Sequence, residues 1–285
     1  MLANCQDYTN ALIEKRLISW RDDSREAHHL SELKVGIAQF HSPDLSGSLP
    51  RITSLLDKGA DVVLLPEKWM NGGDTNEVDG ESDYLGRLSA LASEYGSVIL
   101  SGGMMERDGG NLHISCYAFG RDGGMVAHCR KLHPFGIERR SITPGRAISH
   151  FDIDGIRIGV AICYDLDFPE TVRRFAMAGC DMIAVPAKIR WEGIDPWLIY
   201  LQARALENRM PVAFANAVSP PHFMGRSGVV DLTRSADGMM MFPRTRLLGE
   251  GEEEGIFTID PAAYREDRVS RLSERNPHTD ALSGE

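Results

Sequence analysis

The sequence predicts an α/β protein in which two β-sheets pack together under outer helices. From Lys34 onward, segments with the periodicity of strands alternate with segments that have the periodicity of helices, which is the pattern of α/β domains. Many of the strand segments are apolar on one face or nearly throughout, so they need to be covered by other elements. No run rich in Pro, Gly and Ser divides the 285 residues. We therefore expect one central domain, over residues 34–262.

Two shorter segments flank this domain. Residues 1–33 are expected to form a helical extension, because apolar side chains between Leu12 and Trp20 can share one helical face. Residues 263–285 carry many charges and few apolar side chains, so this C-terminal tail would be costly to order alone. We expect the tail to contribute to contacts between subunits.

The elements of the central domain follow from periodicity and from turn residues. The link from Gly120 to Gly124 is rich in turn residues and suits a hairpin between two strands. The expected helices lie near residues 47–59, 82–95, 169–178 and 195–208. The expected strands lie at 34–40, 61–65, 97–101, 111–119, 124–129, 156–162, 181–185 and 211–216, with three more within 225–259.

Composition argues against several classes of function. The formal net charge of −10 and the pI near 5.4 disfavour binding to nucleic acid or to anionic membrane surfaces. No apolar run approaches the roughly 18 residues that a membrane span needs. The five cysteines are scattered and odd in number, which suggests a reducing compartment rather than a disulfide framework. We therefore expect a cytoplasmic protein.

The stretch from Ile156 to Glu170 is the first candidate for chemistry. Its first seven residues read as a buried strand, and Cys163 follows directly. Pro169 and Glu170 suit the first turn of a helix. Open α/β folds place their chemistry at the carboxyl ends of strands, so Cys163 is a candidate nucleophile. On this stretch alone, a small buried cysteine with a packing role is the more common case, since cysteine usually packs as a small hydrophobe.

Two further stretches end in residues that chemistry can use. Residues 61–67 form an apolar segment that presents the carboxylate of Glu67 at its end. Residues 125–138 contain a strand-like segment that delivers Lys131, with Glu138 seven residues further on. A base, a cation and a thiol thus follow one another along the chain at the ends of strands.

Taken together, the three motifs resemble those of the nitrilase superfamily of carbon–nitrogen hydrolases. The Pro-Glu motif of that family falls on Pro66-Glu67, its Arg-Lys-x-His motif on Arg130 to His133, and its Cys-x-Asp-x-x-Phe-Pro-Glu motif on Cys163 to Glu170. Any one of them is a weak signal, whereas three in the family's order are a strong one. The resemblance covers about residues 34–262. It implies a four-layer αββα sandwich, a Glu–Lys–Cys catalytic set, and subunits that pair into a homodimer or a larger homo-oligomer.

The resemblance also implies a role for each residue of the set. Cys163 is the nucleophile, Glu67 the general base, and Lys131 the cation that favours the thiolate and the oxyanion. The backbone N–H of Tyr164 is expected to be a second oxyanion donor. Glu138 matches a further carboxylate that the family uses beside this set. It either places the substrate or orients Lys131, and the sequence leaves both roles open.

The residues expected around the substrate depart from the family. Asp167 stands where many members have a basic or bulky residue, and Lys188 where many have Asn or Ser. The candidates for the substrate wall are Lys188, Trp191, Glu192 and Trp197, although a structural role is equally open for each tryptophan. Lys188 either points inward and favours a substrate with a distant carboxylate, or it pairs with Asp167 or Glu192 and leaves a neutral pocket.

We therefore expect a thiol-dependent amidase that releases ammonia from a small linear amide. The alternatives within the family are an N-carbamoyl amine or amino-acid amidohydrolase and a nitrilase. A catalytically silent scaffold is the alternative from a different class, and the intact Glu67, Lys131 and Cys163 argue against it.

No cofactor or metal is expected. The sequence contains no glycine-rich phosphate loop of either standard form. His128 and Cys129 lie next to each other on a strand and would point to opposite faces, which disfavours a shared metal. The expected partners are the amide substrate, water and further copies of the same chain.

Overall fold

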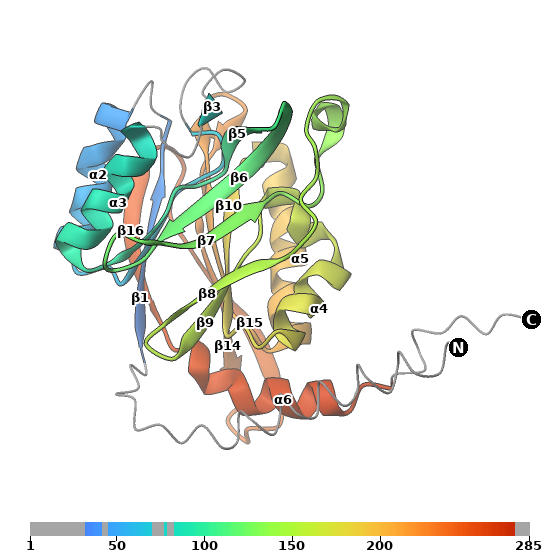
Figure 1. Ribbon diagram of the computed structural model, residues 1–285. Helices are drawn as coiled ribbons and strands as arrows, with labels where there is room; N and C mark the ends of the chain where they lie inside the picture. The colour runs from blue at the N-terminus through green and yellow to red at the C-terminus, as the bar shows by residue number, and fades with distance from the viewer. Residues whose placement is uncertain (1–31, 42–44, 70–76, 79–82, 277–285) are drawn as a thin grey trace, which may run out of the picture.

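The computed structural model describes residues 32–41, 45–69, 77–78 and 83–276. Within these residues the chain forms four layers, in which two helices, two sheets and two further helices follow one another (Figure 1). The αββα architecture expected from the sequence is confirmed. None of the helices in these described ranges is long and apolar enough to cross a membrane. The outer helices are α2 (Leu45–Asp57) and α3 (Asp83–Tyr95) on one side, and α4 (Pro169–Met177) and α5 (Ile194–Asn208) on the other.

Both sheets are mixed, and the first begins and ends with distant parts of the chain. Its strands run in the order β16 (Glu253–Ile259), β1 (Leu33–Gln39), β2 (Val62–Leu64), β4 (Val98–Leu100), β6 (Asn111–Phe119), β5 (Met104–Asp108) and β3 (Glu77–Val78), with β7 (Met125–Arg130) paired to β6. The second sheet has the order β15 (Met241–Leu247), β14 (Gly228–Arg234), β11 (Val212–Asn216), β10 (Met182–Ala187), β9 (Ile156–Val160) and β8 (Ser149–Ile153).

Strand β2 shows why the strands are apolar nearly throughout. Val62 and Leu64 lie in the core between the two sheets, whereas Val63 and Leu65 pack in a second core with side chains of α2 and α3. Successive side chains of a strand point to opposite faces. Because both faces of β2 are covered, both sets of side chains have to be apolar.

The close approach of α4 to the second sheet depends on a glycine. A Cβ at Gly159 in β9 would lie only 2.5 Å from Cδ1 of Phe175 in α4. Phe175 is buried and belongs to the core between the sheets and the outer helices. The glycine at this position of the strand therefore allows the helix that follows Cys163 to pack tightly.

Most expected elements are found within a few residues of their expected bounds. The expected hairpin around Gly120 to Gly124 is confirmed, because β6 and β7 pair antiparallel. Strands β5 and β8 were not among the expected elements. Only two of the five residues of β8 are buried, so its apolar signal is weak. β16 pairs antiparallel with β1, a contact between opposite ends of the described chain that local periodicity does not reveal.

Part of the C-terminal tail is a helix fixed to the core by ion pairs. Helix α6 (Arg265–Ser273) places Arg265 and Arg268 against the buried carboxylate of Asp181. Arg265 donates to Asp181 at 2.9 and 2.6 Å, and Arg268 donates at 2.5 Å. Both Asp181 and Arg268 are 1% exposed. The role proposed for the tail in subunit contacts stays a prediction.

Asp181→Ala is expected to lower the free energy of unfolding by about 3–5 kcal/mol, because it leaves the buried Arg268 guanidinium without its carboxylate. Denaturation with guanidinium chloride measures the change. Asp267→Ala is the control, since Asp267 pairs with Arg234 at the surface and such pairs contribute about 0–1 kcal/mol. An equal effect of the two substitutions would contradict this reading of α6.

Candidate active site

Cys163 lies in a strained turn at the end of the second sheet's strand β9. The chain leaves β9 at Val160 and enters a short 3₁₀ turn, Cys163–Asp167. Cys163 has a φ of +50°, in the left-handed region that a residue with a side chain seldom adopts. Such a conformation costs about 1–3 kcal/mol and is concentrated at functional sites. The thiol is 5% exposed.

Glu67 reaches the same place from the first sheet. It follows β2, and its backbone N–H donates to the carbonyl of Ala187 at the end of β10, at 3.2 Å. Glu67 therefore sits where the two sheets meet. Its carboxylate is buried, and it lies close enough to the Cys163 thiol to raise the pKa of that thiol.

The position of the Glu67 side chain depends on Gly103, which pairs with it in an isolated bridge. A Cβ at Gly103 would lie 2.7 Å from Cγ of Glu67 and 3.3 Å from its Cα. Gly103→Ala is therefore expected to displace the Glu67 carboxylate and, if Glu67 acts as the expected base, to lower kcat/KM about 10- to 100-fold. Steady-state kinetics measure the loss. Gly86→Ala is the control, because a Cβ at Gly86 meets no atom within 4 Å, and wild-type activity of Gly103→Ala would refute the constraint.

Lys131 is held between two carboxylates. Its Nζ donates to Oε1 of Glu67 at 2.8 Å and to Oε2 of Glu138 at 2.9 Å. The lysine follows β7 and is 1% exposed. Burial opposes its charge, but Glu67, the Cys163 sulfur and Glu138 outweigh that effect and raise the pKa of Lys131. Lys131 therefore carries a permanent positive charge beside the thiol.

The electrostatics keep Cys163 protonated at rest. Burial raises the pKa of its thiol well above the usual value, and the negative charge of Glu67 raises it further. The ammonium of Lys131 and the backbone N–H of Lys188 act in the opposite direction. A protonated thiol is a weak nucleophile, so attack by this sulfur requires a base, and Glu67 is the carboxylate whose charge acts on it.

Two residues beside this set were not among the candidates from the sequence. Asp165, buried in the 3₁₀ turn, accepts hydrogen bonds from the backbone N–H groups of Ile162, Leu132 and His133. It thereby ties the segment after Lys131 to the turn that carries Cys163. Lys68 donates to Oε1 of Glu138 at 2.9 Å. Asp165 stands inside the motif that begins at Cys163, and Lys68 directly follows Glu67. Closeness in sequence to a candidate residue is therefore the signal that could have identified both as part of the site.

The four candidates for the substrate wall differ in their surroundings. The backbone N–H of Lys188 faces the Cys163 sulfur, and its Nζ lies 3.3 Å from the carbonyl oxygen of Lys68 and 5.1 Å from the centre of the Phe223 ring. Trp191 is exposed, and Glu192 pairs with Arg190 at the surface. Trp197 is buried in α5.

Trp197 has the surroundings of a core residue. Its ring packs edge-on against Phe214 of β11, with ring centres 5.5 Å apart. Both residues belong to the main hydrophobic core. Asp167, the other departure from the family, lies half-buried, and burial raises the pKa of its carboxyl group.

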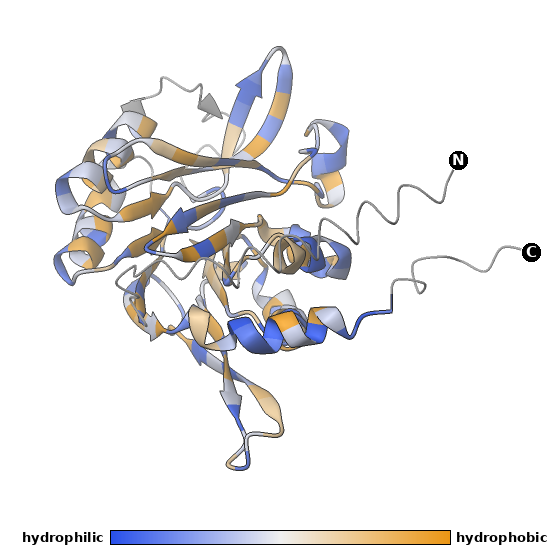
Figure 2. Cartoon of the chain, turned by 60° about the horizontal axis from the view of Figure 1, so that its bottom comes forward, coloured by the Kyte–Doolittle hydropathy of each residue, from blue (hydrophilic) through white to orange (hydrophobic). Residues whose placement is uncertain are grey.

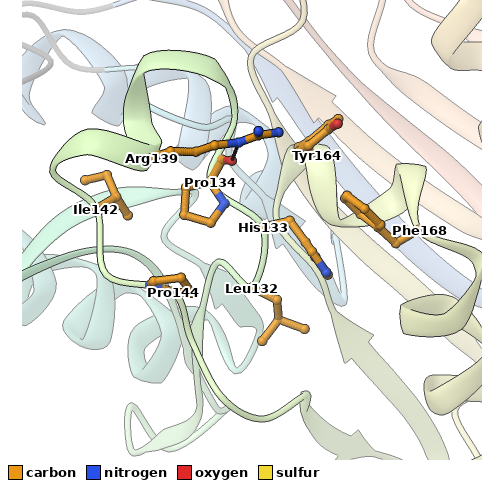
Figure 3. A pocket seen from close by; sticks show the side chains of 8 residues that line it. All are labelled: Leu132, His133, Pro134, Arg139, Ile142, Pro144, Tyr164 and Phe168. Atoms are coloured by element: carbon orange, nitrogen blue, oxygen red, sulfur yellow. Dashed lines mark hydrogen bonds between the residues drawn. The ribbon is translucent and has the colours of Figure 1, made fainter.

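A surface hollow of about 330 Å³ lies on the outer side of this turn. Figure 3 shows Tyr164, Phe168 and His133 along one side of it. His133 and Phe168 stack with ring centres 3.8 Å apart, and Tyr164 contacts Phe168 edge-on. Cys163, Glu67 and Lys131 do not line the hollow. Its lining residues are Leu132, His133, Pro134, Arg139, Ile142, Pro144, Tyr164 and Phe168.

No group of three or more His, Cys, Asp or Glu side chains in the described part of the chain is placed so that it could hold a metal ion. The described cysteines, Cys116, Cys129, Cys163 and Cys180, are all free and buried. Of these four, only Cys163 has both a carboxylate and a buried ammonium beside its sulfur, and the ammonium of Lys131 donates a hydrogen bond to the carboxylate of Glu67. Cys163 therefore has the surroundings of a reacting thiol.

Comparisons with known proteins show the family of the chain. The model of the carbon-nitrogen hydrolase family matches residues 34–241. The chain is 33% identical over 209 residues to the omega-amidase NIT2-A of Xenopus laevis, covering 66% of this chain and 75% of that protein. It is 32% identical over 214 residues to the 2-oxoglutaramate amidase of Bacillus subtilis, covering 71% and 78%.

The fold is also found among solved structures. A variant of the amidase from Nesterenkonia sp. AN1, with the acetamide moiety of fluoroacetamide covalently added at its active-site cysteine, superposes with a TM-score of 0.68. The identity is 22%, and the match covers 90% of this chain and 98% of that chain. The two chains therefore share the four-layer fold over nearly their whole lengths.

Proposed function

Because this chain belongs to the carbon–nitrogen hydrolase family, we propose that it is an amidase that releases ammonia from a small linear amide through a thioester on Cys163. One observation carries the proposal: Glu67 contacts both the Cys163 thiol and the buried ammonium of Lys131. A base that lies beside both a nucleophile and a cation is what acyl transfer from an amide requires. The named relatives are amidases, which agrees with this choice.

In the first step the Glu67 carboxylate accepts the proton of the Cys163 thiol while the sulfur attacks the amide carbon. The π electrons of the C=O bond move onto oxygen, and Lys131 stabilises the resulting oxyanion. We infer that the backbone N–H groups of Tyr164 and Lys188 assist, since Tyr164 is the second residue of the 3₁₀ turn that begins at Cys163 and the N–H of Lys188 acts on the sulfur. The geometry thus concentrates positive potential where negative charge develops.

The intermediate then collapses with cleavage of the C–N bond. Protonated Glu67 gives its proton to the leaving nitrogen, ammonia departs, and a thioester remains on Cys163. Glu67 next takes a proton from water, and the hydroxide attacks the thioester carbon. Collapse of the second intermediate breaks the C–S bond, the sulfur recovers the proton from Glu67, and the carboxylic acid is released. The same carboxylate therefore serves as base and acid in both halves of the reaction.

A panel of aliphatic amides, ω-amides of dicarboxylic acids, ureido compounds and nitriles tests the proposal. We expect ammonia release from the amides, at the highest kcat/KM within the panel. Ammonia together with carbon dioxide from ureido compounds, or turnover of nitriles in preference to amides, would replace the amidase by one of the other family activities. Release from none of the compounds would contradict the proposal.

For the substrate class we propose an ω-amide that carries a carboxylate distant from the scissile bond, with Lys188 as the residue that recognises it. Its ammonium is half-buried near the Lys68 carbonyl and the Phe223 ring, and its backbone faces the thiol. Glu192, one expected internal partner, pairs with Arg190 instead. The omega-amidase and 2-oxoglutaramate amidase relatives support this substrate class.

Lys188→Met is expected to lower kcat/KM for an ω-amide monoacid about 10- to 100-fold and to change kcat/KM for a neutral aliphatic amide much less. Only the monoacid carries a carboxylate that the Lys188 ammonium can bind. The ratio of the two kcat/KM values, measured in wild type and variant, isolates recognition from general damage. An unchanged ratio would show that Lys188 does not select the substrate.

We further propose a cytoplasmic homo-oligomer. The free cysteines of the described residues suit a reducing compartment. Helix α5 exposes Ile199 and Tyr200, which are apolar side chains that a second subunit would cover. Sedimentation at micromolar concentration distinguishes a monomer from a dimer, and Ile199→Glu is expected to shift the equilibrium toward the monomer.

A further inference from the structure

Lys68 adds a second cation to the catalytic set. Its Nζ lies 2.9 Å from Oε1 of Glu138, while Lys131 lies 2.9 Å from Oε2 of the same carboxylate. Lys131 also lies 2.8 Å from Glu67. The four side chains therefore form an unbroken row of alternating charge, Glu67, Lys131, Glu138 and Lys68, which begins at the Cys163 thiol.

The backbone directs Lys68 toward this row. Lys68 has a φ of +49°, in the left-handed region that side chains seldom adopt. Its N–H donates to the carbonyl of Gly103 at 2.8 Å, and its own carbonyl accepts from Nζ of Lys188. The sharp change of direction after Glu67 lets two neighbouring residues reach opposite ends of one charged row.

The charges show what Lys68 contributes. With a neutral thiol, Glu67 and Glu138 together carry two negative charges, and Lys131 alone carries one positive charge. Because Lys131 and Glu67 are almost fully buried, an excess negative charge there is weakly screened. It would oppose both the thiolate and the oxyanion. Lys68 brings the row to neutrality and weakens the attraction of Glu138 for Lys131.

We propose that Lys68 is a positioning residue of this site, whose ammonium holds and neutralises Glu138 so that the charge of Lys131 remains available to the thiolate and the oxyanion. The inference rests on the proposed function for its catalytic consequence. Its electrostatic part concerns the thiol alone and holds for any substrate. Glu138 supports it, because burial would raise the pKa of that carboxyl, yet the charges of Lys131 and Lys68 together hold it below its usual value.

Lys68→Met removes the charge and keeps most of the length of the unbranched side chain. We expect kcat for a primary amide to fall about 10-fold with KM changed less than about twofold, since the proposal places Lys68 away from the substrate. Lys68→Arg, which keeps the charge, is expected to recover most of the loss. Lys58→Met is the matched control, because Lys58 is an exposed lysine just beyond helix α2. Lys68→Gln serves the same comparison if Lys68→Met does not fold.

A double-mutant cycle with Glu138→Gln tests whether Lys68 acts through Glu138. On the Glu138→Gln background, Lys68→Met is expected to change kcat less than about twofold. A full 10-fold loss on that background would overturn the proposal, because Lys68 would then act without Glu138. A loss confined to KM would overturn it too, because it would assign Lys68 to substrate binding.

The rate of Cys163 alkylation by iodoacetamide against pH supplies a readout without substrate. We expect Lys68→Met to shift this profile to higher pH relative to wild type and Lys58→Met, because the uncompensated Glu138 charge disfavours the thiolate. A shifted profile in a protein that hydrolyses no amide would refute the proposed function and leave this inference standing. An unshifted profile with unchanged kcat in an active amidase would refute the inference alone.

Discussion

Cys163→Ala is expected to abolish amide hydrolysis, with kcat reduced by about 10⁴-fold or more, because no other described side chain brings a nucleophilic sulfur to Glu67 and Lys131. The variant should remain folded. Alanine replaces a buried sulfur by a smaller apolar group and meets the same φ of +50° as cysteine does, so the stability change is expected to stay within about 1 kcal/mol. Ammonia release and thermal unfolding measure the two quantities.

Cys180→Ala is the matched control for this substitution. Cys180 is also free and fully buried, but it lies next to Asp181 under helix α6, away from the catalytic set. The Cys180→Ala variant should retain wild-type kcat, and iodoacetamide should still inactivate this variant. In Cys163→Ala the same reagent should no longer label the active-site thiol. Substantial activity in folded Cys163→Ala would exclude the thioester route.

Lys131→Met is expected to reduce kcat/KM by at least about 10³-fold, a larger effect than the loss of one oxyanion donor. The substitution removes the cation that faces the oxyanion. It also leaves the carboxylates of Glu67 and Glu138 without the ammonium that each contacts now. Like charges in a buried site favour protonation of one of them, and a protonated Glu67 cannot act as a base. Steady-state kinetics and denaturation by guanidinium chloride are the measurements.

Combining Lys131→Met with Glu138→Gln separates the two causes. Removing the second carboxylate should restore stability, since breaking a buried ion pair costs about 3–5 kcal/mol and much of that cost is the unpaired charge. It should not restore kcat, because the oxyanion still lacks its cation. If the double variant regained most of the activity, Lys131 would serve only to separate two carboxylates.

The stabilisation that Lys131 and Glu138 provide depends on pH in a defined direction. The pKa of Glu138 is lowered in the folded state, so its contribution is full above the usual glutamate value and is lost as the pH falls through the lowered one. The pKa of Lys131 is raised, so its contribution is full below the usual lysine value and is lost as the pH rises through the raised one. The stability difference between wild type and Lys131→Met should therefore be largest between about pH 5 and pH 10.

The sequence left two roles open for Glu138, which are to place the substrate or to orient Lys131, and its contacts favour the second. Its two oxygens accept from Lys68 and Lys131, and one also accepts from the backbone N–H of Phe135. A carboxylate with these donors is held in place by the protein and faces Lys131 directly. We therefore favour the role in orienting Lys131, and the cycle with Lys68 tests it.

Local pattern in the sequence was enough to predict the layers and to single out Glu67, Lys131 and Cys163, which the structure brings together. Strand β2 is apolar on both faces because a sheet and a helical layer cover it. Burial of both faces requires consecutive apolar residues, which are visible in the sequence. The turn after β9 carries a cysteine at a strand end, and the motifs of Glu67 and Lys131 lie at strand ends too. Each of these signals lies within a few residues, so the sequence alone could carry it.

The tertiary structure decided which charges meet. The sequence placed Lys68 beside Glu67 in the chain, but only the left-handed turn at Lys68 and the approach of the segment after β7 bring it to Glu138. In the same way, Trp197 was a candidate for the substrate wall, and the packing of α5 on β11 places it in the core. Contacts of this kind depend on how distant segments pack. Their energies come from burial and from ion pairs that form only in the folded chain. The local periodicity of the sequence therefore does not predict these contacts.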